Sequence, residues 1–175
     1  MRGAFALVLA AGVTGAFAGG MAAIVTERQQ GMKDMAASAR IIAGMFKEPA
    51  AYDQRRFRAA AETIAAHAGD TLAAQFPPET LGPPSAARAA IAEKPDEFAA
   101  LARELRREAQ ALAEKAANTL TPAMRMGAGT EAGASSLLGR RAQKTDNLQS
   151  IPAEHVFHMM LQGCTACHAV YREKP

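Results

Sequence analysis

The 175-residue sequence has no tryptophan, only two tyrosines and only two cysteines, and aromatic residues make up 5% of it. β-Branched residues are also few, whereas alanine is abundant. Strands favour aromatic and β-branched side chains, and alanine is the strongest helix former. The composition therefore argues against a β-sheet and predicts an all-helical protein.

The sequence also lacks any block of basic residues with aromatic residues interleaved. Its 20 lysines and arginines are nearly balanced by 17 acidic residues. Nucleic-acid-binding domains usually show a clustered basic patch together with a recognisable motif. We therefore expect no nucleic-acid partner.

The small number of cysteines limits the chemistry that they can carry out. A structural zinc site needs four ligands, and two cysteines cannot supply them alone. A thioredoxin-like dithiol lies at a helix N-terminus within a βαβ pattern, which is not seen here. A redox dithiol, a disulfide and a metal site are therefore the less favoured interpretations of the cysteine pair.

The favoured interpretation comes from the motif around the pair, Cys164-Thr165-Ala166-Cys167-His168. It reads Cys-x-x-Cys-His, the attachment pattern of a c-type haem. The thiols would form thioethers with the porphyrin, and His168 would be the proximal iron ligand. Positions i, i+3 and i+4 share one face of a helix, so all three side chains can reach one cofactor. We expect one covalently bound haem c.

The N-terminus resembles a secretory signal peptide. Arg2 precedes an apolar run from Ala4 to Ala18, which ends in the small-x-small pattern Ala16-Phe17-Ala18. We expect cleavage after Ala18, which makes residues 1–18 the signal peptide.

An uncleaved membrane anchor is the alternative, because no charge occurs between Arg2 and Glu27. The run contains Ala and Gly rather than Leu and Ile, which weakens membrane insertion. Export also agrees with the haem motif, because bacteria attach c-type haem outside the cytoplasm. We therefore expect residues 19–175 to form one domain in the periplasm.

Four amphipathic segments have apolar residues three and four positions apart, which predicts helices. They run from about Met21 to Phe46, from about Tyr52 to Phe76, from Pro95 to about Ala116 and from Pro152 to about Tyr171. A turn-rich stretch covers 79–85, and a short helix at 86–93 is compatible with the sequence. We predict an antiparallel four-helix bundle with the haem near the C-terminal helix.

Residues 118–150 show no sustained periodicity and form a long insert before that last helix. We interpret Met124 and Met126 within it as packing or exposed residues, because methionine adapts to irregular gaps. The outer face of the third segment is predicted to be solvated; it comprises Arg103, Glu104, Arg106, Arg107 and Glu108.

Three histidines lie outside the motif. His155 and His158 are expected to be partly exposed, and a metal site there would need further ligands. His67 is expected at the surface, with ligation of the haem iron as the minor alternative.

The chain resembles the cytochrome c-prime and cytochrome c-556 family, the class II c-type cytochromes. The C-terminal haem motif is followed by Ala169-Val170-Tyr171-Arg172, and 28–35 is similar to the family's Arg-Gln-x-x-(Leu or Met)-x-x-Met. Lys94-Pro95 before Phe98 is similar to a third family motif. The likeness covers about 24–117 and 153–174; the family's tryptophan is absent, and Ala169 replaces a common Asp.

The resemblance implies roles for several residues. His168 would be the fifth iron ligand, and Met32 would face the distal side of the haem. Arg28 and Arg172 would lie near the haem propionates or the proximal face, and Met35 would belong to the haem environment. Arg28 also lies on the apolar stripe of its helix, from which we expect a contact with something buried and acidic.

Met32 decides between two functions. If it ligates the iron, the protein is an electron carrier with redox partner proteins, which is the interpretation that we favour. If the iron is five-coordinate, the protein binds NO or CO. An enzyme is not expected, because the segment around Met32 offers only Lys33 and Asp34 as acid–base groups. The family resemblance allows a homodimer through the first two helices.

Overall fold

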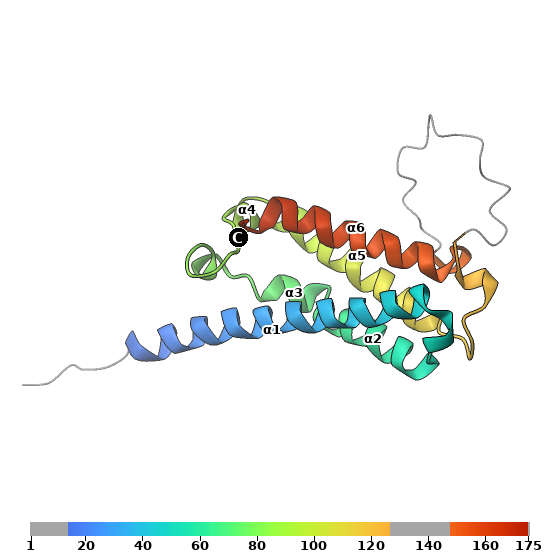
Figure 1. Cartoon of the computed structure of the whole chain (residues 1–175). Coiled ribbons are helices and arrows are strands. Elements are labelled where there is room, and N and C mark those ends of the chain that lie inside the picture. Colours follow the sequence, from blue (N-terminus) through green and yellow to red (C-terminus); the bar gives the residue numbers. More distant parts are fainter. Residues whose placement is uncertain (1–13, 127–147, 175) are drawn as a thin grey trace, which may run out of the picture.

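The computed structural model describes residues 14–126 and 148–174. Over these ranges it contains six α-helices: α1 (Thr14–Lys47), α2 (Gln54–His67), α3 (Asp70–Ala74), α4 (Ala90–Glu93), α5 (Pro95–Glu114) and α6 (Ala153–Tyr171). Single-turn 3-10 helices lie at Pro49–Ala51, Pro78–Thr80, Pro122–Met124 and Leu148–Ser150. Figure 1 shows that α1, α2, α5 and α6 alternate in direction. The predicted all-helical, antiparallel four-helix bundle is confirmed.

The bundle has two hydrophobic clusters. The larger one joins all four long helices and includes the ring contacts of Phe46 with Phe57 and with Phe157, at 5.6 and 5.7 Å between centroids. The smaller one lies at the C-terminal end of α6, where the ring of Phe98 contacts Phe76 at 5.0 Å and Tyr171 at 5.2 Å. Burial of these rings fixes the positions of the helices between which the candidate site lies.

The prediction of one continuous second helix is wrong, because this segment forms two helices, α2 and α3. α2 begins where the Asp53 side chain caps it by accepting a hydrogen bond from the backbone N–H of Arg56 at 2.8 Å. It ends before Gly69, which has φ +72° and donates its N–H to the carbonyl of Ala102 at 2.8 Å. This tertiary hydrogen bond to α5 turns the chain, and α3 begins at Asp70.

The ends of two other elements also differ from the prediction. α1 begins at Thr14, earlier than the predicted start near Met21, and α4 is limited to Ala90–Glu93. Within 14–126 and 148–174, no helix is both long and apolar enough to cross a membrane. Most of the predicted insert, 127–147, lies outside the described residues, as do residues 1–13 of the predicted signal peptide.

Candidate functional site

The haem motif lies inside a long helix. Since α6 runs from Ala153 to Tyr171, Cys164 is well past its first turn and the whole motif is helical. Both cysteine thiols are free and partly buried, and the His168 side chain is exposed. The helical spacing therefore places the three side chains on one face of α6, as the sequence predicts.

Two cavities meet at this face. One, of about 440 Å³, is lined by α1, the end of α6 and residues 85–91, and the other, of about 380 Å³, is lined by α1, α2, α5 and α6. Both volumes are within the usual range for ligand pockets. Four residues line both cavities: Met32, Ala36, Cys167 and His168. The shared wall thus joins the two cavities beside the attachment motif.

The lining is suited to an iron porphyrin. It is largely apolar, and the charged groups described on it are Arg28, Lys33 and Arg172 in the first cavity and Arg40 in the second. No acidic side chain lines either cavity among the described residues. An apolar slot with cations at its edge matches an apolar ring that carries two propionates. The residues present therefore fit a haem.

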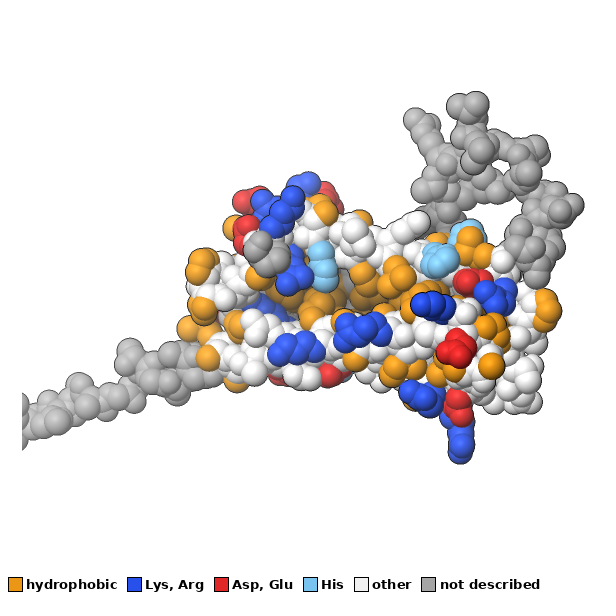
Figure 2. Space-filling model, in the orientation of Figure 1, with side chains coloured by type: hydrophobic (Ala, Val, Ile, Leu, Met, Phe, Trp, Pro, Cys, Tyr) orange, Lys and Arg blue, Asp and Glu red, His pale blue; other side chains and the backbone are white. Residues whose placement is uncertain are grey.

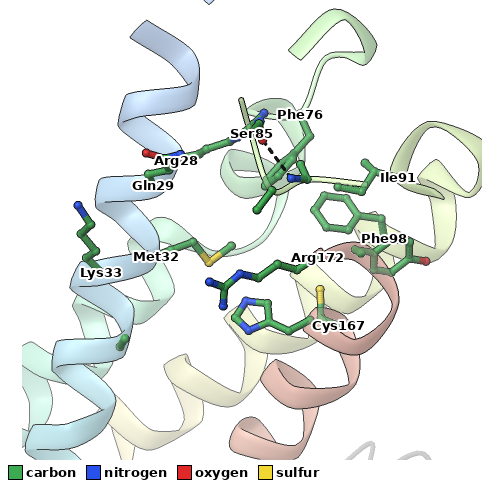
Figure 3. A pocket seen from close by; sticks show the side chains of 15 residues that line it. Arg28, Gln29, Met32, Lys33, Phe76, Ser85, Ile91, Phe98, Cys167 and Arg172 are labelled. Atoms are coloured by element: carbon green, nitrogen blue, oxygen red, sulfur yellow. Dashed lines mark hydrogen bonds between the residues drawn. The ribbon is translucent and has the colours of Figure 1, made fainter. Parts of the chain in front are cut away.

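Met32 lies on α1, opposite the motif. Its side chain is partly buried and points across the cavity toward Cys167 of α6 and toward Arg172, which directly follows α6 (Figure 3). Met35, one turn further along α1, is 8% exposed and lines only the second cavity. Of these two methionines, only Met32 lies on the wall that the two cavities share.

Arg28 is buried at 3% exposure, as its place on the apolar stripe predicts. Its guanidinium donates to the Gln75 carbonyl at 3.0 Å, the Thr80 hydroxyl and carbonyl at 2.7 Å each, and the Ser85 hydroxyl at 2.5 Å. It also stacks over the Phe76 ring at 4.5 Å. Among the described residues its partners are neutral oxygens and a ring, and its positive charge faces the first cavity without a carboxylate, so the expected buried acidic partner is not one of these residues and stays a prediction.

Arg172, in contrast, is exposed at the end of α6. Its segment is held by an antiparallel bridge to Ala87 and by the hydrogen bond from Glu173 N–H to the Ala86 carbonyl at 2.8 Å. Burial, with a contribution from Arg172, lowers the pKa of His168. Both effects favour the neutral imidazole, the form that donates a lone pair to a metal.

The cysteines do not resemble a redox dithiol. Burial raises the pKa of the Cys164 thiol, and burial together with Cys164 raises the pKa of Cys167 to about 11. Reactive dithiols have a lowered pKa and lie at a helix N-terminus. The less favoured dithiol interpretation therefore finds no support in the geometry.

Glu108 was predicted to lie on a solvated face, and this prediction is wrong. The side chain is 4% exposed, and its carboxylate lies close to Gly163, beside Cys164. Burial, with a contribution from Glu104, raises its pKa to about 7. A single charged residue on an otherwise charged helix face carries no sequence signal that distinguishes it from its exposed neighbours.

The remaining histidines lie away from the cavities. His67 is half-buried and lies 3.7 Å from Asp34, and it lines neither cavity, so it is not placed to ligate the iron. His155 and His158 are exposed near the start of α6, as predicted. Met124 is buried and Met126 is 47% exposed, which agrees with packing and surface roles respectively.

A sequence profile of the family described as Cytochrome C' matches residues 23–135, more than half of the chain. The chain belongs to the cytochrome c' family. The match ends before Cys164, so the Cys-x-x-Cys-His motif is an additional observation beside it. No curated protein matches the chain significantly.

Solved cytochromes c' share the fold of this chain. The protein from Thermochromatium tepidum superposes with a TM-score of 0.62 at 23% identity, over 88% of this chain and 97% of that one. A cytochrome c' with an unusual ligand-controlled dimer dissociation gives 0.61 at 21% identity, over 88% and 97%. A mutant of Rhodopseudomonas palustris cytochrome c' gives 0.60 at 22% identity, over 86% and 98%.

Membership of the cytochrome c' family gives the cofactor. The protein is a c-type cytochrome with one covalently attached haem c. This confirms the cofactor that the cysteine motif predicts. The cavities beside that motif are the place in the described structure where the cofactor fits.

Proposed function

We propose that Cys164 and Cys167 attach the haem and that His168 is its proximal ligand. We further propose that the iron binds NO or CO on the face of the haem that lies toward Met32. This differs from the favoured sequence interpretation, in which Met32 ligates the iron. Family membership supports the change, because the gas-binding alternative agrees better with a cytochrome c'. Met32 then acts as a bulky apolar cover over the distal side.

The observation that carries the proposal is the apolar lining of the second cavity. Of the residues described on it, only Arg40 and His168 have a charged or titratable side chain apart from the two cysteines. Such a wall offers little to water or to charged ligands, which lose hydrogen bonds on entry. Small uncharged gases lose least, so this lining favours them.

When bound, haem c would supply an iron that can bind a small gas or exchange an electron. The protein residues would position the haem and select the ligand that reaches its iron. The His168 imidazole would donate its lone pair, and its pKa, lowered first by partial desolvation and then by Arg172, favours the neutral form. Arg28 and Arg172 would neutralise propionates at the edge of the first cavity. Of Lys33 and Asp34, the two acid–base residues next to Met32, only Lys33 lines a cavity. This segment therefore brings no acid–base pair to the cavity, which supports a non-enzymatic role.

The test is the Met32→Ala variant, followed by absorption and magnetic circular dichroism spectroscopy. We expect the wild-type ferrous protein to be high-spin and to bind CO. The variant should stay high-spin and bind CO roughly 10-fold faster, because a steric cover has been removed. Met45→Leu is the matched control, since Met45 is a buried methionine of α1 that lines neither cavity, and it should leave the CO rate within about twofold.

A low-spin wild-type protein that becomes high-spin in Met32→Ala would contradict this proposal. It would identify Met32 as the sixth ligand and support an electron carrier. One observation favours that second function: the cationic side chains around the cavities, Lys33, Arg40 and Arg172, are all exposed. Figure 2 shows Lys and Arg side chains in a row along α1, beside a hydrophobic hollow. An acidic redox partner would match this surface.

Two further parts of the proposal concern the whole protein. Export to the periplasm with cleavage after Ala18 would give a mature chain starting at Gly19, which mass spectrometry of the purified protein can test. Cleavage there would remove the first residues of α1.

A homodimer is proposed from the relative with ligand-controlled dimer dissociation; sedimentation with and without CO tests it.

A further inference from the structure

A methionine sulfur and a histidine nitrogen lie in contact far from the haem motif. Met126 Sδ is 3.0 Å from His158 Nδ1, although the two residues are 32 positions apart in the sequence. His155 lies three residues before His158 and is exposed as well, so both imidazoles lie on the same side of α6. Figure 2 shows histidine side chains at this end of the molecule, next to hydrophobic ones.

The structure holds Met126 in this place through its backbone. The Met126 N–H donates to Glu154 Oε2 at 2.7 Å, and Arg125 Nε lies 3.6 Å from the same oxygen. Glu154 is in the first turn of α6, directly before His155. The chain that leads to Met126 is therefore fastened to the helix that carries both histidines.

Burial does not account for the position of the thioether. Met126 is one of four large hydrophobic residues that are exposed among the described ones, at 47%, whereas the nearby Met124 is 6% exposed and packs in the core. The exposed sulfur contacts the exposed His158 imidazole, and the exposed His155 lies three residues earlier on the same side of α6, so all three side chains are accessible to an ion from solvent.

We propose that Met126, His155 and His158 form a binding site for a single Cu(I) ion. The three donor groups are uncharged, and a thioether is a soft ligand that selects Cu(I) over harder divalent ions. Zinc structural sites use thiolates, imidazoles and carboxylates, and thioether sulfur is not among their ligands. Both side chains of the Met126–His158 contact are exposed, so small rotations admit an ion between them.

The site is independent of the haem and of the function proposed above. His158 precedes His168 by ten residues, which is about 15 Å along an α-helix. None of the three residues lines either cavity beside the haem motif. Copper can therefore be counted against haem iron in the same molecule.

The experiment uses the reduced holoprotein under argon, so that copper and haem exchange no electrons. It is dialysed against Cu(I) in a buffer with a competing chelator, and copper and iron are then measured by atomic absorption. We expect about one copper per iron in the wild type. Met126→Leu, which keeps the volume but removes the sulfur, and His158→Ala should each weaken binding at least 10-fold.

His67→Ala is the matched control, because His67 lies on α2 away from the proposed site, and it should retain copper like the wild type. The haem absorption spectrum and helical circular dichroism check that each variant is folded. Absence of copper in the wild-type protein would overturn the proposal. Equal retention by Met126→Leu and wild type would do so too, because the thioether would then not be a ligand.

Discussion

Two charged side chains are buried among the described residues, Arg28 and Glu108, and they differ in how burial is compensated. Arg28 keeps its charge, because four neutral oxygens and an aromatic ring replace water around it. Glu108 instead has a pKa raised to about 7 by burial and by Glu104. A carboxylic acid can become neutral near physiological pH, and a guanidinium cannot.

This shift of Glu108 has a consequence for stability that depends on pH. The folded protein binds the proton more tightly than the unfolded chain, whose value is near 4.5. Below pH 4.5 the Glu108 carboxyl is neutral in both states, so its burial does not lower the free energy of unfolding through ionisation. As the pH rises from 4.5 through about 7, the free energy of unfolding falls. The full shift corresponds to about 3 kcal/mol, an upper limit.

Glu108→Gln should remove this pH dependence. The amide keeps the shape and stays neutral, so the wild-type protein should lose about 2 kcal/mol more than the variant between pH 5 and pH 8. Guanidinium unfolding of the holoprotein, followed by circular dichroism at several pH values, measures the difference. Glu62→Gln, at an exposed position of α2, is the control and should follow the wild type; identical pH curves for all three proteins would contradict the prediction.

At the scale of the element, the break between α2 and α3 depends on Gly69. Its φ of +72° with ψ −146° is a conformation that side chains with a Cβ rarely adopt. An added Cβ would also lie 2.7 Å from Arg106 Cδ. The break lets the N–H of Gly69 bond to Ala102 on α5, which ties the second helix to the third.

Replacing Gly69 by Ala should therefore lower the free energy of unfolding by about 2 kcal/mol. Gly44→Ala is the opposite control, because Gly44 lies inside α1 with open space around it. It should stabilise the protein by about 0.5–1 kcal/mol, since alanine restricts the unfolded chain and favours the helix. Thermal unfolding of both variants checks the two signs, and an equal effect of both would refute the role of Gly69.

At the scale of the whole molecule, charge is unevenly placed. The formal net charge is only +3, yet the described charged residues that line the two cavities are all basic. The propionates of a bound haem would neutralise part of this positive charge. The exposed remainder, with Lys33 and Arg40 on α1, creates a positive potential over the cavity mouth that attracts anions.

We expect this potential to appear in electron exchange with small probes. Oxidation of the ferrous protein by anionic ferricyanide should slow as ionic strength rises from about 0.01 to 0.15 M, whereas a cationic cobalt oxidant should speed up. Lys33→Gln with Arg40→Gln should slow the ferricyanide reaction about threefold at low salt. Lys47→Gln, at the far end of α1, serves as the control in stopped-flow measurements. Equal salt dependence with both oxidants would argue against a local positive surface.

The sequence by itself determined the class of the protein, its four long helices and its cofactor motif. Alanine-rich segments with apolar residues three and four apart fix helices locally, and Pro95 and Pro152 mark their starts without help from other elements. Cys164, Cys167 and His168 share one face through helix geometry alone. The burial of Arg28 was also predictable, from its place on an apolar stripe.

Only the tertiary structure decided what surrounds those residues. The neutral oxygens around Arg28, the burial of Glu108, the break at Gly69 and the sulfur beside His158 all join segments that are far apart in the chain. Local periodicity has no information on such contacts, because they depend on how helices pack against one another. For the same reason the sequence could place Met32 only on a face of its own helix, whereas packing brought it to the wall of the two cavities that His168 also lines.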